Sequence, residues 1–451
     1  MAAGDNPISL SDMDARTDSK DGMGESLQTR VARADNGFEV PLDQLMHSGE
    51  KPLLWSVDER LRLIRRRTTG CVAIRSREVF RVNLSSGRQL ELISGQQVLK
   101  VDGWRSLTEL SAGSRIAVVR RLPEPVQLKR MHDSEIIMLA HMIGDGSCIK
   151  RQPVRYASID EANLVAVTIA AAHFGVTPIR DEYAAARVTT LRLPAPFRLT
   201  HGKRNPIAEW LDGLGLFGLR SYDKFVPAEV FALPNEQVAL FLRHLWATDG
   251  SVRWDAKTSQ GRVYYASTSR RLIENVMHLI LRMGVQTRIT RTTKAGYRDC
   301  WFLTIDRAAN QIAFLTKVGV HGERGLKAKE VVEKLAGRIR RPGTDTIPVE
   351  IWDQIRAHMA QRNWSDKDFA LATNTRYEGP LMWTHAPGRS RLHRISGILE
   401  DPALHDLATN DIYWDKVVEI VSMGHREVCI VADTGGDPVV TQGVVVRYPA
   451  A

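Results

Sequence analysis

A short apolar element that ends in aspartate and glycine occurs twice in this chain. The first copy runs from Leu139 to Gly146, and the second runs from Leu242 to Gly250. The apolar residues of each copy predict a buried helix that ends beside its carboxylate. A chain that carries this element twice must place two such helix ends, which constrains its fold more than its composition does.

Residues around each copy indicate where the two helices begin and end. We expect Gly146 and Gly250 to end them, because glycine turns left-handed without steric cost. Capping side chains mark the starts: Asp133 or Ser134 for a helix from Glu135 to Ile143, and Asn235, after Pro234, for a helix from Gln237 to Thr248.

The repeat extends beyond the two helices. Tyr156–Ser158 recurs 109 residues later as Tyr265–Ser267, and Gly175-Val176 recurs at the same offset as Gly284-Val285. The two aspartates are 104 residues apart, so the second copy has a longer connection between helix and strand. Constant offsets on both sides of a variable loop indicate a duplicated module. Each module is predicted to contain a helix with a terminal aspartate, then β-strands, then a second helix.

Asp145 and Asp249 occupy positions where a carboxylate is disfavoured. A helix C-terminus carries the negative end of the macrodipole, and two packed helices would bring the two acids together. A hard divalent cation with oxygen ligands resolves both problems, and Mg²⁺ is the usual occupant of such sites. The pair therefore predicts a metal site between the modules.

These residues resemble the LAGLIDADG homing endonucleases, in the double-motif form found inside inteins. Lys224, in Lys224–Pro227, matches a lysine that these enzymes carry ahead of the second motif. The resemblance implies a pseudo-two-fold αββαββ pair whose saddle-shaped sheets lie on double-stranded DNA. It also implies that Asp145 and Asp249, with the preceding Gly144 and Thr248, hold Mg²⁺ or Mn²⁺, and that Lys224 assists catalysis.

Charge supports a polyanion as partner. Lys and Arg number 62 against 52 Asp and Glu, which gives a net charge of +10, and the pI is about 9.5. The excess is concentrated between Ser251 and Cys300, on strands that the family would lay against DNA. The DNA-binding candidates there are Arg253, Lys257, Arg262, Arg288, Arg291, Lys294 and Arg298.

Other features indicate no further chemistry. The four cysteines are far apart and predict neither a zinc site nor a disulfide framework. No signal peptide or membrane-spanning run is recognisable, so we expect a cytoplasmic, monomeric protein with no membrane partner.

Short alternating strands are predicted on both sides of the duplicated modules. The order of β region, nuclease and β region resembles an intein, in which a splicing (Hint) domain is interrupted by an endonuclease; the resemblance extends to inteins of actinobacterial replicative helicases. We expect an α+β multidomain protein. Its predicted parts are a disordered tail at 1–23, a Hint-like all-β domain split into 24–125 and 408–451, an inserted endonuclease domain at 126–335 with repeats at about 131–210 and 235–335, and a small helical module at 347–400.

The splicing chemistry of that resemblance is missing. The family starts with Cys or Ser, where alignment of Thr29–Val31 places Met23 or Gly24. Its Thr-x-x-His falls on Ile93–Gln96, and its terminal His-Asn is replaced near Arg447 and Tyr448. We therefore expect a β scaffold that persists without splicing.

The segment from 347 to 400 predicts a helix-turn-helix. Pro348 starts a helix through Gln361, with Ile351, Trp352, Ile355 and Met359 on one face. Ser365 caps a second helix from Asp366 to Ala372, with Asp368 as the capping-box acid. A third helix from Arg376 to Trp383 is expected after the turn, with Arg376 reaching DNA.

The prediction from the sequence is a site-specific DNA endonuclease that acts at an insertion site in a helicase gene. One alternative is a regulator that binds DNA on the same scaffold without cutting it, and such regulators tend to lack the acids that this chain has. The second alternative is an active splicing element, which the replaced residues oppose.

Overall fold

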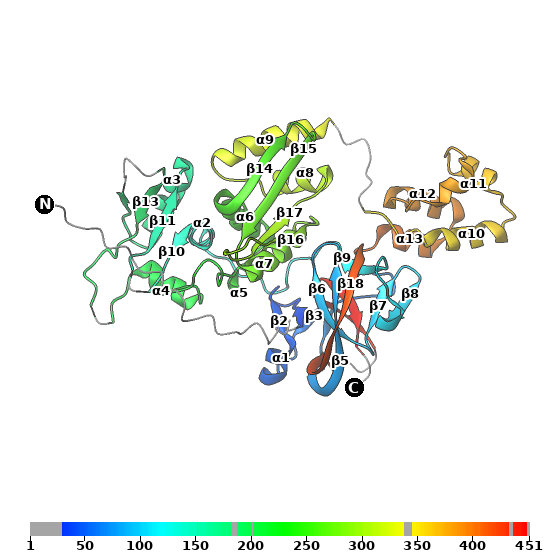
Figure 1. The fold of residues 1–451 in the computed structure, drawn as a ribbon, viewed down its shortest axis with the longest axis horizontal. Coiled ribbons are helices and arrows are strands. Elements are labelled where there is room, and N and C mark those ends of the chain that lie inside the picture. The colour runs from blue at the N-terminus through cyan, green and yellow to red at the C-terminus, as the bar shows by residue number, and fades with distance from the viewer. Residues whose placement is uncertain are drawn as a thin grey trace.

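The computed structural model of the protein describes residues 29–150, 152–181, 187–200, 202–337, 345–432 and 436–448. Figure 1 shows a β-rich unit, two neighbouring α/β modules and a small group of helices. The predicted tail at 1–23 and the positions Met23 and Gly24 lie outside the described residues. No helix among those described is long and apolar enough to cross a membrane.

Strands from both ends of the chain form one ten-stranded sheet. Its order is β2-β1-β19-β20-β9-β18-β5-β6, and β7 joins it on β20 with β8 alongside. Residues before 120 and after 411 therefore share one β unit, and the α/β modules and helices lie between them in sequence. The elements are β1 (Arg30–Ala32), β2 (Glu39–Pro41), α1 (Leu42–Ser48), β3 (Leu53–Val57), β4 (Leu63–Arg67), β5 (Cys71–Leu84), β6 (Gln89–Ile93), β7 (Gln97–Lys100), β8 (Gly103–Ser106), the 3-10 turn η2 (Leu107–Glu109), β9 (Arg115–Val119), β18 (Ile412–Val431), β19 (Pro438–Thr441) and β20 (Val444–Arg447).

Each α/β module contains a four-stranded antiparallel sheet. The first sheet has the order β10-β11-β13-β12, and the second has the order β14-β15-β17-β16. The first module comprises α2 (Asp133–Ile143), β10 (Gly146–Ser147), β11 (Arg155–Ser158), α3 (Glu161–His173), β12 (Ile179–Asp181), β13 (Thr189–Arg192) and α4 (Pro206–Gly213). The second comprises α5 (Ala228–Phe231), α6 (Asn235–Asp249), β14 (Gly250–Asp255), β15 (Gln260–Ser267), α7 (Arg270–Arg282), β16 (Arg288–Thr292), β17 (Cys300–Thr304), α8 (Ala308–Lys317) and α9 (Glu323–Ala336).

Strand register shows that the two modules are equivalent. Gly146 lies opposite Tyr156 in the first sheet, and Gly250 lies opposite Tyr265 in the second. Both tyrosines are fully buried. The offset of 109 residues that the sequence shows therefore matches one backbone position in two copies of the same fold.

The glycines of the two motifs serve close packing, which corrects the expected left-handed turns. Gly144, and not the expected Gly146, is the C-cap of α2, with a φ of −72°. Gly250 ends α6 as expected, with a φ of −77°. A Cβ on Gly144 would lie 2.0 Å from Thr248 Oγ1, and a Cβ on Gly250 would lie 2.3 Å from the Trp246 carbonyl oxygen. The absence of a side chain, and not a positive φ, is what these positions require.

The predicted caps of the two helices were also wrong. His132 caps α2, since its ring accepts a hydrogen bond from the Ser134 amide while Glu135 bonds back to the His132 amide. Histidine is not among the usual capping residues, so composition did not indicate it. The second helix starts at Asn235 itself, after Pro234, and has no side-chain cap.

A separate helical module follows the second α/β module. It comprises α10 (Ile351–Gln361), α11 (Asp366–Ala372), the 3-10 turn η3 (Gly379–Trp383), α12 (Arg389–Leu399) and α13 (Pro402–Thr409). The predicted apolar face of α10 is buried, and Ser365 and Asp368 form the predicted capping box. The predicted third helix is wrong, because Arg376 precedes a short 3-10 turn in which Gly379 and Pro380 interrupt an α-helix. The next α-helix begins only at Arg389, too far from α11 for a helix-turn-helix.

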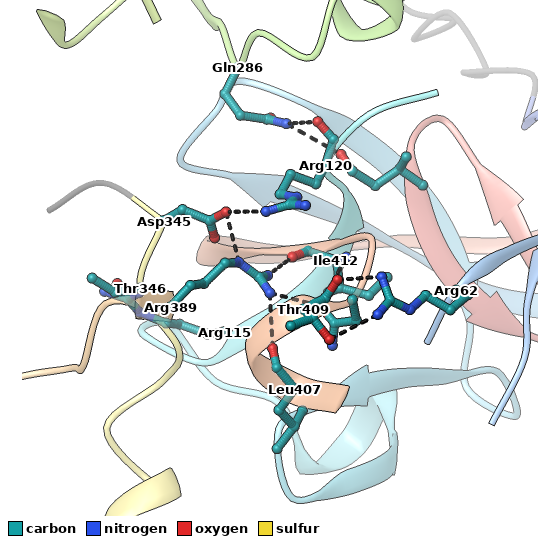
Figure 2. A network of polar contacts seen from close by, with 12 residues as sticks. Arg62, Arg115, Arg120, Gln286, Asp345, Thr346, Arg389, Leu407, Thr409 and Ile412 are labelled. Atoms are coloured by element: carbon teal, nitrogen blue, oxygen red, sulfur yellow. Dashed lines mark hydrogen bonds and ion pairs between the residues drawn. The ribbon is translucent and has the colours of Figure 1, made fainter. Parts of the chain in front are cut away.

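One polar network joins the helical module to the β unit (Figure 2). Asp345 pairs with Arg120 at 3.3 Å and with Arg389 at 2.8 Å. Arg389 also donates to the carbonyl of Leu407 at 2.9 Å. Beside this network, Gln286 of the second α/β module donates to the carbonyl of Arg120 at 2.8 Å. Arg120 therefore contacts both neighbours of the β unit.

Candidate metal and nucleic-acid site

The ends of α2 and α6 form the centre of the candidate site. Both helices are buried along most of their length, because apolar side chains surround them. The close contact between Gly144 and Thr248 lets the two helix ends meet. Asp145 and Asp249, one from each module, follow directly from this contact and keep solvent-exposed side chains. Two carboxylates are thus presented together, where a phosphate could reach them.

The surroundings disfavour the ionised form of both acids. Lost hydration among the packed helix ends, followed by the charge of Asp249, raises the pKa of Asp145 to about 6. Lost hydration also raises the pKa of Asp249, while Lys224 and Arg324 act in the opposite direction. The crowding that the sequence predicts is therefore present, and a cation between the acids would relieve it.

Lys224 lies at the end of α2 and not over open solvent. Its ammonium group donates to the carbonyl oxygens of Met142 at 2.9 Å, Gly144 at 3.2 Å and Gly146 at 2.8 Å. An ammonium group has three donors, so all three are engaged. Burial lowers the pKa of Lys224, and the charges of nearby groups oppose this effect. In this geometry Lys224 satisfies carbonyls that a helix end leaves without partners.

Arg324, at the start of α9, has a similar place at the end of α6. Its guanidinium donates to the carbonyl of Ala247, which also accepts from Asn163 Nδ2 at 3.1 Å. Its charge acts on both Asp145 and Asp249. Sequence reasoning missed Arg324 because it lies 75 residues beyond Asp249, outside both motifs.

The carboxylate pair suits a hard divalent cation. No group of three or more His, Cys, Asp and Glu side chains in the described parts of the chain could hold a metal ion. Mg²⁺ often binds proteins through only one or two carboxylates and completes its shell with water and phosphate. Asp145 and Asp249 fit that donor set. The Gly144 carbonyl, a predicted ligand, already accepts from Lys224.

A buried histidine pair lies between the two motif helices. His141 Nε2 and His244 Nδ1 share a hydrogen bond of 3.0 Å, and His141 Nδ1 contacts the hydroxyl of Tyr156 at 2.9 Å. His321 stacks on His244 with ring centroids 4.3 Å apart. Burial lowers the pKa of His244 to about 3 and lowers the pKa of His141 as well. The His141 and His244 rings are therefore part of the core.

The predicted DNA-binding residues divide between the two faces of the second sheet. Val252, Val263 and Leu303 define the buried face, and strand alternation places Arg253 and Arg262 on the other face as direct cross-strand partners. Arg288 shares that open face opposite Thr304, and pairs with Asp306. Arg291 lies opposite Trp301 on the helix-facing side, where it pairs with Asp299. The register therefore separates Arg291 from the other three arginines.

The remaining DNA-binding candidates lie outside the strands. Lys257 is in the turn between β14 and β15, and its amide bonds Asp255 at 3.1 Å. Lys294 lies over Tyr297, and the Arg298 guanidinium lies 3.6 Å from the ring centre of Tyr222. Arg376 is exposed on the helical module. The first module adds Arg155 and Arg192, a cross-strand pair that sequence reasoning did not select.

The positions that resemble splicing residues come together in the β unit. Gln96 is buried, and its side-chain oxygen accepts from the Ile93 amide at 2.8 Å. Arg447 lies opposite Gln97 where β20 pairs with β7. The next residue, Tyr448, is buried and contacts Thr441 Oγ1 at 3.2 Å. Apolar and amide side chains thus occupy the place where the resemblance expects threonine and histidine.

Comparisons with known proteins agree with this description. Residues 236–319 match the LAGLIDADG-like domain. The chain is 32% identical over 434 residues to a protein named replicative DNA helicase DnaB from Synechocystis sp.. The aligned region covers 94% of this chain and 49% of the relative. It is 34% identical over 411 residues to the protein of the same name from Rhodothermus marinus, covering 89% of this chain and 43% of the relative. The chain thus spans about half the length of these relatives.

Similar solved structures include a DnaB intein from Synechocystis sp. PCC 6803, with 24% identity and a TM-score of 0.20 over 21% of this chain and 66% of that chain. They also include I-DmoI in complex with DNA and Mn, with 16% identity and a TM-score of 0.28 over 42% of this chain and 96% of that chain. At these scores the structural likeness is weak. A specific likeness to actinobacterial helicases stays a prediction. The two motifs, the matched LAGLIDADG-like domain and the helicase relatives together support an intein-embedded LAGLIDADG protein.

Proposed function

We propose that the protein is a site-specific endonuclease that hydrolyses phosphodiester bonds in double-stranded DNA with Mg²⁺ or Mn²⁺. The observation that carries this proposal is the exposed carboxylate pair of Asp145 and Asp249, one from each module, at the contact between α2 and α6. Regulation by DNA binding alone would not require two disfavoured carboxylates in one place. The presence of both carboxylates therefore favours a metal-dependent reaction over DNA binding alone.

Each part of the site has a role in this reaction. Asp145 and Asp249 would hold the metal, which when bound polarises phosphate oxygens and lowers the pKa of water. The carbonyls at the helix ends are held by Lys224 and Arg324, so the carboxylates keep a fixed spacing. We assign Lys224 to positioning first, since its donors are already engaged, and its predicted role toward the phosphate stays a proposal.

DNA would lie across the open faces of the two sheets. Arg253, Arg262 and Arg288 supply positive charge on the second sheet, and Arg155 and Arg192 supply it on the first. Contacts to phosphates give affinity, and side chains that reach base edges give specificity. We propose that the recognised sequence is an insertion site in a helicase gene, that the protein acts as a monomer in the cytoplasm, and that its β unit has lost splicing.

The test is cleavage of plasmid DNA that carries the uninterrupted helicase-gene site. Wild-type protein with Mg²⁺ or Mn²⁺ should linearise the plasmid. Asp145→Asn and Asp249→Asn should each abolish double-strand cleavage and bind the DNA nearly as well, because an amide cannot replace the metal-binding charge. Binding by wild-type protein without cleavage under any divalent ion would favour the regulator instead.

A further inference from the structure

Asp160 caps two helices that belong to different modules. Its Oδ1 accepts from the Ala162 amide at 3.0 Å, which caps α3 of the first module. Its Oδ2 accepts from the Glu323 amide at 2.8 Å, at the start of α9 in the second module. A carboxylate near two helix N-termini is favoured by both macrodipoles. Asp160 is also buried, so its two hydrogen bonds belong to the interior of the protein and not to its surface.

The backbone around Gly322 is built for this contact. Gly322 has a φ of +71°, which other residues rarely adopt, and a Cβ there would lie 2.3 Å from Asp160 Oδ2. Both the conformation and the space therefore exclude a side chain. The preceding residue, His321, contacts the carbonyl of Ala162 at 3.1 Å. The turn before α9 is thus held against the start of α3 by hydrogen bonds from His321 and Glu323.

This contact brings Arg324 to the end of α6. Arg324 follows Glu323 directly, and it donates to the carbonyl of Ala247. Ala247 lies two residues before Asp249, in the last turn of a helix whose carbonyls have no partner in the helix. A cation at this point satisfies the carbonyl and offsets the negative end of the helix.

The same arrangement occurs around the other carboxylate. Ser269 occupies the position equivalent to Asp160, 109 residues later, and caps α7. Its hydroxyl donates to the carbonyl of Lys224 at 2.6 Å, and Lys224 binds the carbonyls at the end of α2. In each case a capping residue of one module holds a cation against the motif helix of the other module. Arg324 is therefore the pseudo-two-fold counterpart of Lys224.

We propose that Asp160 is a latch between the modules that holds Arg324 as a positioning residue for the Asp249 half of the carboxylate pair. The role of Arg324 in cleavage rests on the proposed endonuclease function. The latch itself does not, so the two can fail separately.

The latch is tested without DNA by amide hydrogen exchange on the full chain. Asp160→Ala should speed exchange at the start of α9 and also at the end of α6, by at least about tenfold. Arg324→Ala should speed exchange at the end of α6 while the start of α9 stays protected. If Asp160→Ala leaves the end of α6 as protected as in wild-type protein, the latch is overturned.

The positioning role is tested by single-turnover cleavage and DNA affinity. Arg324→Ala should slow cleavage about tenfold or more with a nearly unchanged Kd, because the guanidinium acts on the helix end and not on DNA. Arg324→Lys should restore most of the rate. Asp160→Ala should slow cleavage similarly, and the double variant should be no slower than Arg324→Ala, since both act through one contact. Lys329→Ala, which removes an exposed charge from the same helix, is the matched control.

The outcomes separate the two proposals. Normal cleavage by a folded Arg324→Ala variant would overturn the positioning role and leave the endonuclease function intact. If wild-type protein never cleaves DNA while Asp160→Ala still speeds exchange at the start of α9 and at the end of α6, the endonuclease function is overturned and the latch stands. Additive rate losses in the double variant would show that Asp160 and Arg324 act independently, which also overturns the latch.

Discussion

Gly144 and Thr248 meet across the interface between the two modules, and a Cβ on Gly144 would lie 2.0 Å from Thr248 Oγ1 and 2.4 Å from Thr248 Cβ. The threonine cannot simply turn aside, because its hydroxyl donates to the carbonyl of Leu245 at 2.6 Å. The contact therefore fixes how closely α2 and α6 approach. It also fixes the spacing of Asp145 and Asp249, which follow these two residues directly.

Replacing Gly144 by alanine should force the two helices apart. We expect a loss of about 1–3 kcal/mol in the free energy of unfolding, the usual effect of overpacking a close contact. Urea unfolding of the full chain measures it. Gly213→Ala is the control, since Gly213 lies in α4 and a Cβ there meets nothing within 4 Å.

A second substitution tests whether the clash with Thr248 is the cause. In the Gly144→Ala background, Thr248→Gly removes the side chain that would collide. The double variant should be less destabilised than the two single losses together predict. Simple additivity would show that the loss has another origin.

The hydrogen bond between His141 and His244 makes stability depend on pH. The bond can hold only one proton between the two rings, so protonation of both rings breaks it. The pKa of His244 is about 3 in the folded protein, below the ordinary value of about 6.5 expected in the unfolded chain. The unfolded state therefore takes up a proton first, and stability is complete above pH 6.5 and lost as the pH falls toward 3.

We expect the free energy of unfolding to fall by about 1.4 kcal/mol per pH unit for each proton excluded from the core. Between pH 7 and 4.5, the slope of the unfolding free energy against pH should be smaller in His244→Gln than in wild-type protein, by the contribution of about one proton. His425→Gln, at an exposed position on β18, should leave the slope unchanged. Equal slopes in all three proteins would show that His244 does not carry the effect.

The sequence predicted the two carboxylates at the centre of the site better than the residues that hold the helix ends around them. Asp145 and Asp249 could be found because their motif repeats, and the duplicated tyrosines indicated the register that both sheets adopt. Arg324 could not be found this way, because its contact with Ala247 depends on the tertiary position of α9. The equal spacing of Asp160 and Ser269 was a usable signal, but neither residue type indicates by itself that it spans two modules.

Helix ends were the least predictable features. His132 took a capping role that its residue type does not favour, and the motif glycines satisfied packing instead of backbone conformation. The third helix of the 347–400 segment failed for a local reason, since Gly379 and Pro380 both oppose an α-helix. Arg376 consequently lies on no recognition helix, and its contact with DNA stays a prediction.

Ile93 and Gln96 predict that the β unit does not splice. The Gln96 side-chain oxygen accepts a hydrogen bond from the Ile93 amide at 2.8 Å. Ile93 lacks the hydroxyl of a threonine, and Gln96 lacks the titratable ring of a histidine. Residues 24–448 fused between two reporter domains should give only full-length precursor. Mass spectrometry that finds a ligated product, or cleavage at the C-terminal junction, would contradict this prediction.

The two faces of the second sheet provide the final prediction. Arg253 and Arg262 are partners on the open face, whereas Arg291 lies opposite Trp301 on the helix-facing side of the same sheet. If DNA lies on the open face, Arg253→Ala and Arg262→Ala should weaken binding. Each should also flatten the slope of log affinity against log salt by about one unit per lost phosphate contact. Arg291→Ala removes the same charge from the other face, so it should leave both quantities nearly unchanged. Fluorescence anisotropy between 50 and 200 mM salt, roughly the range over which phosphate contacts are resolved, measures both. A larger effect from Arg291→Ala than from the open-face variants would place DNA elsewhere.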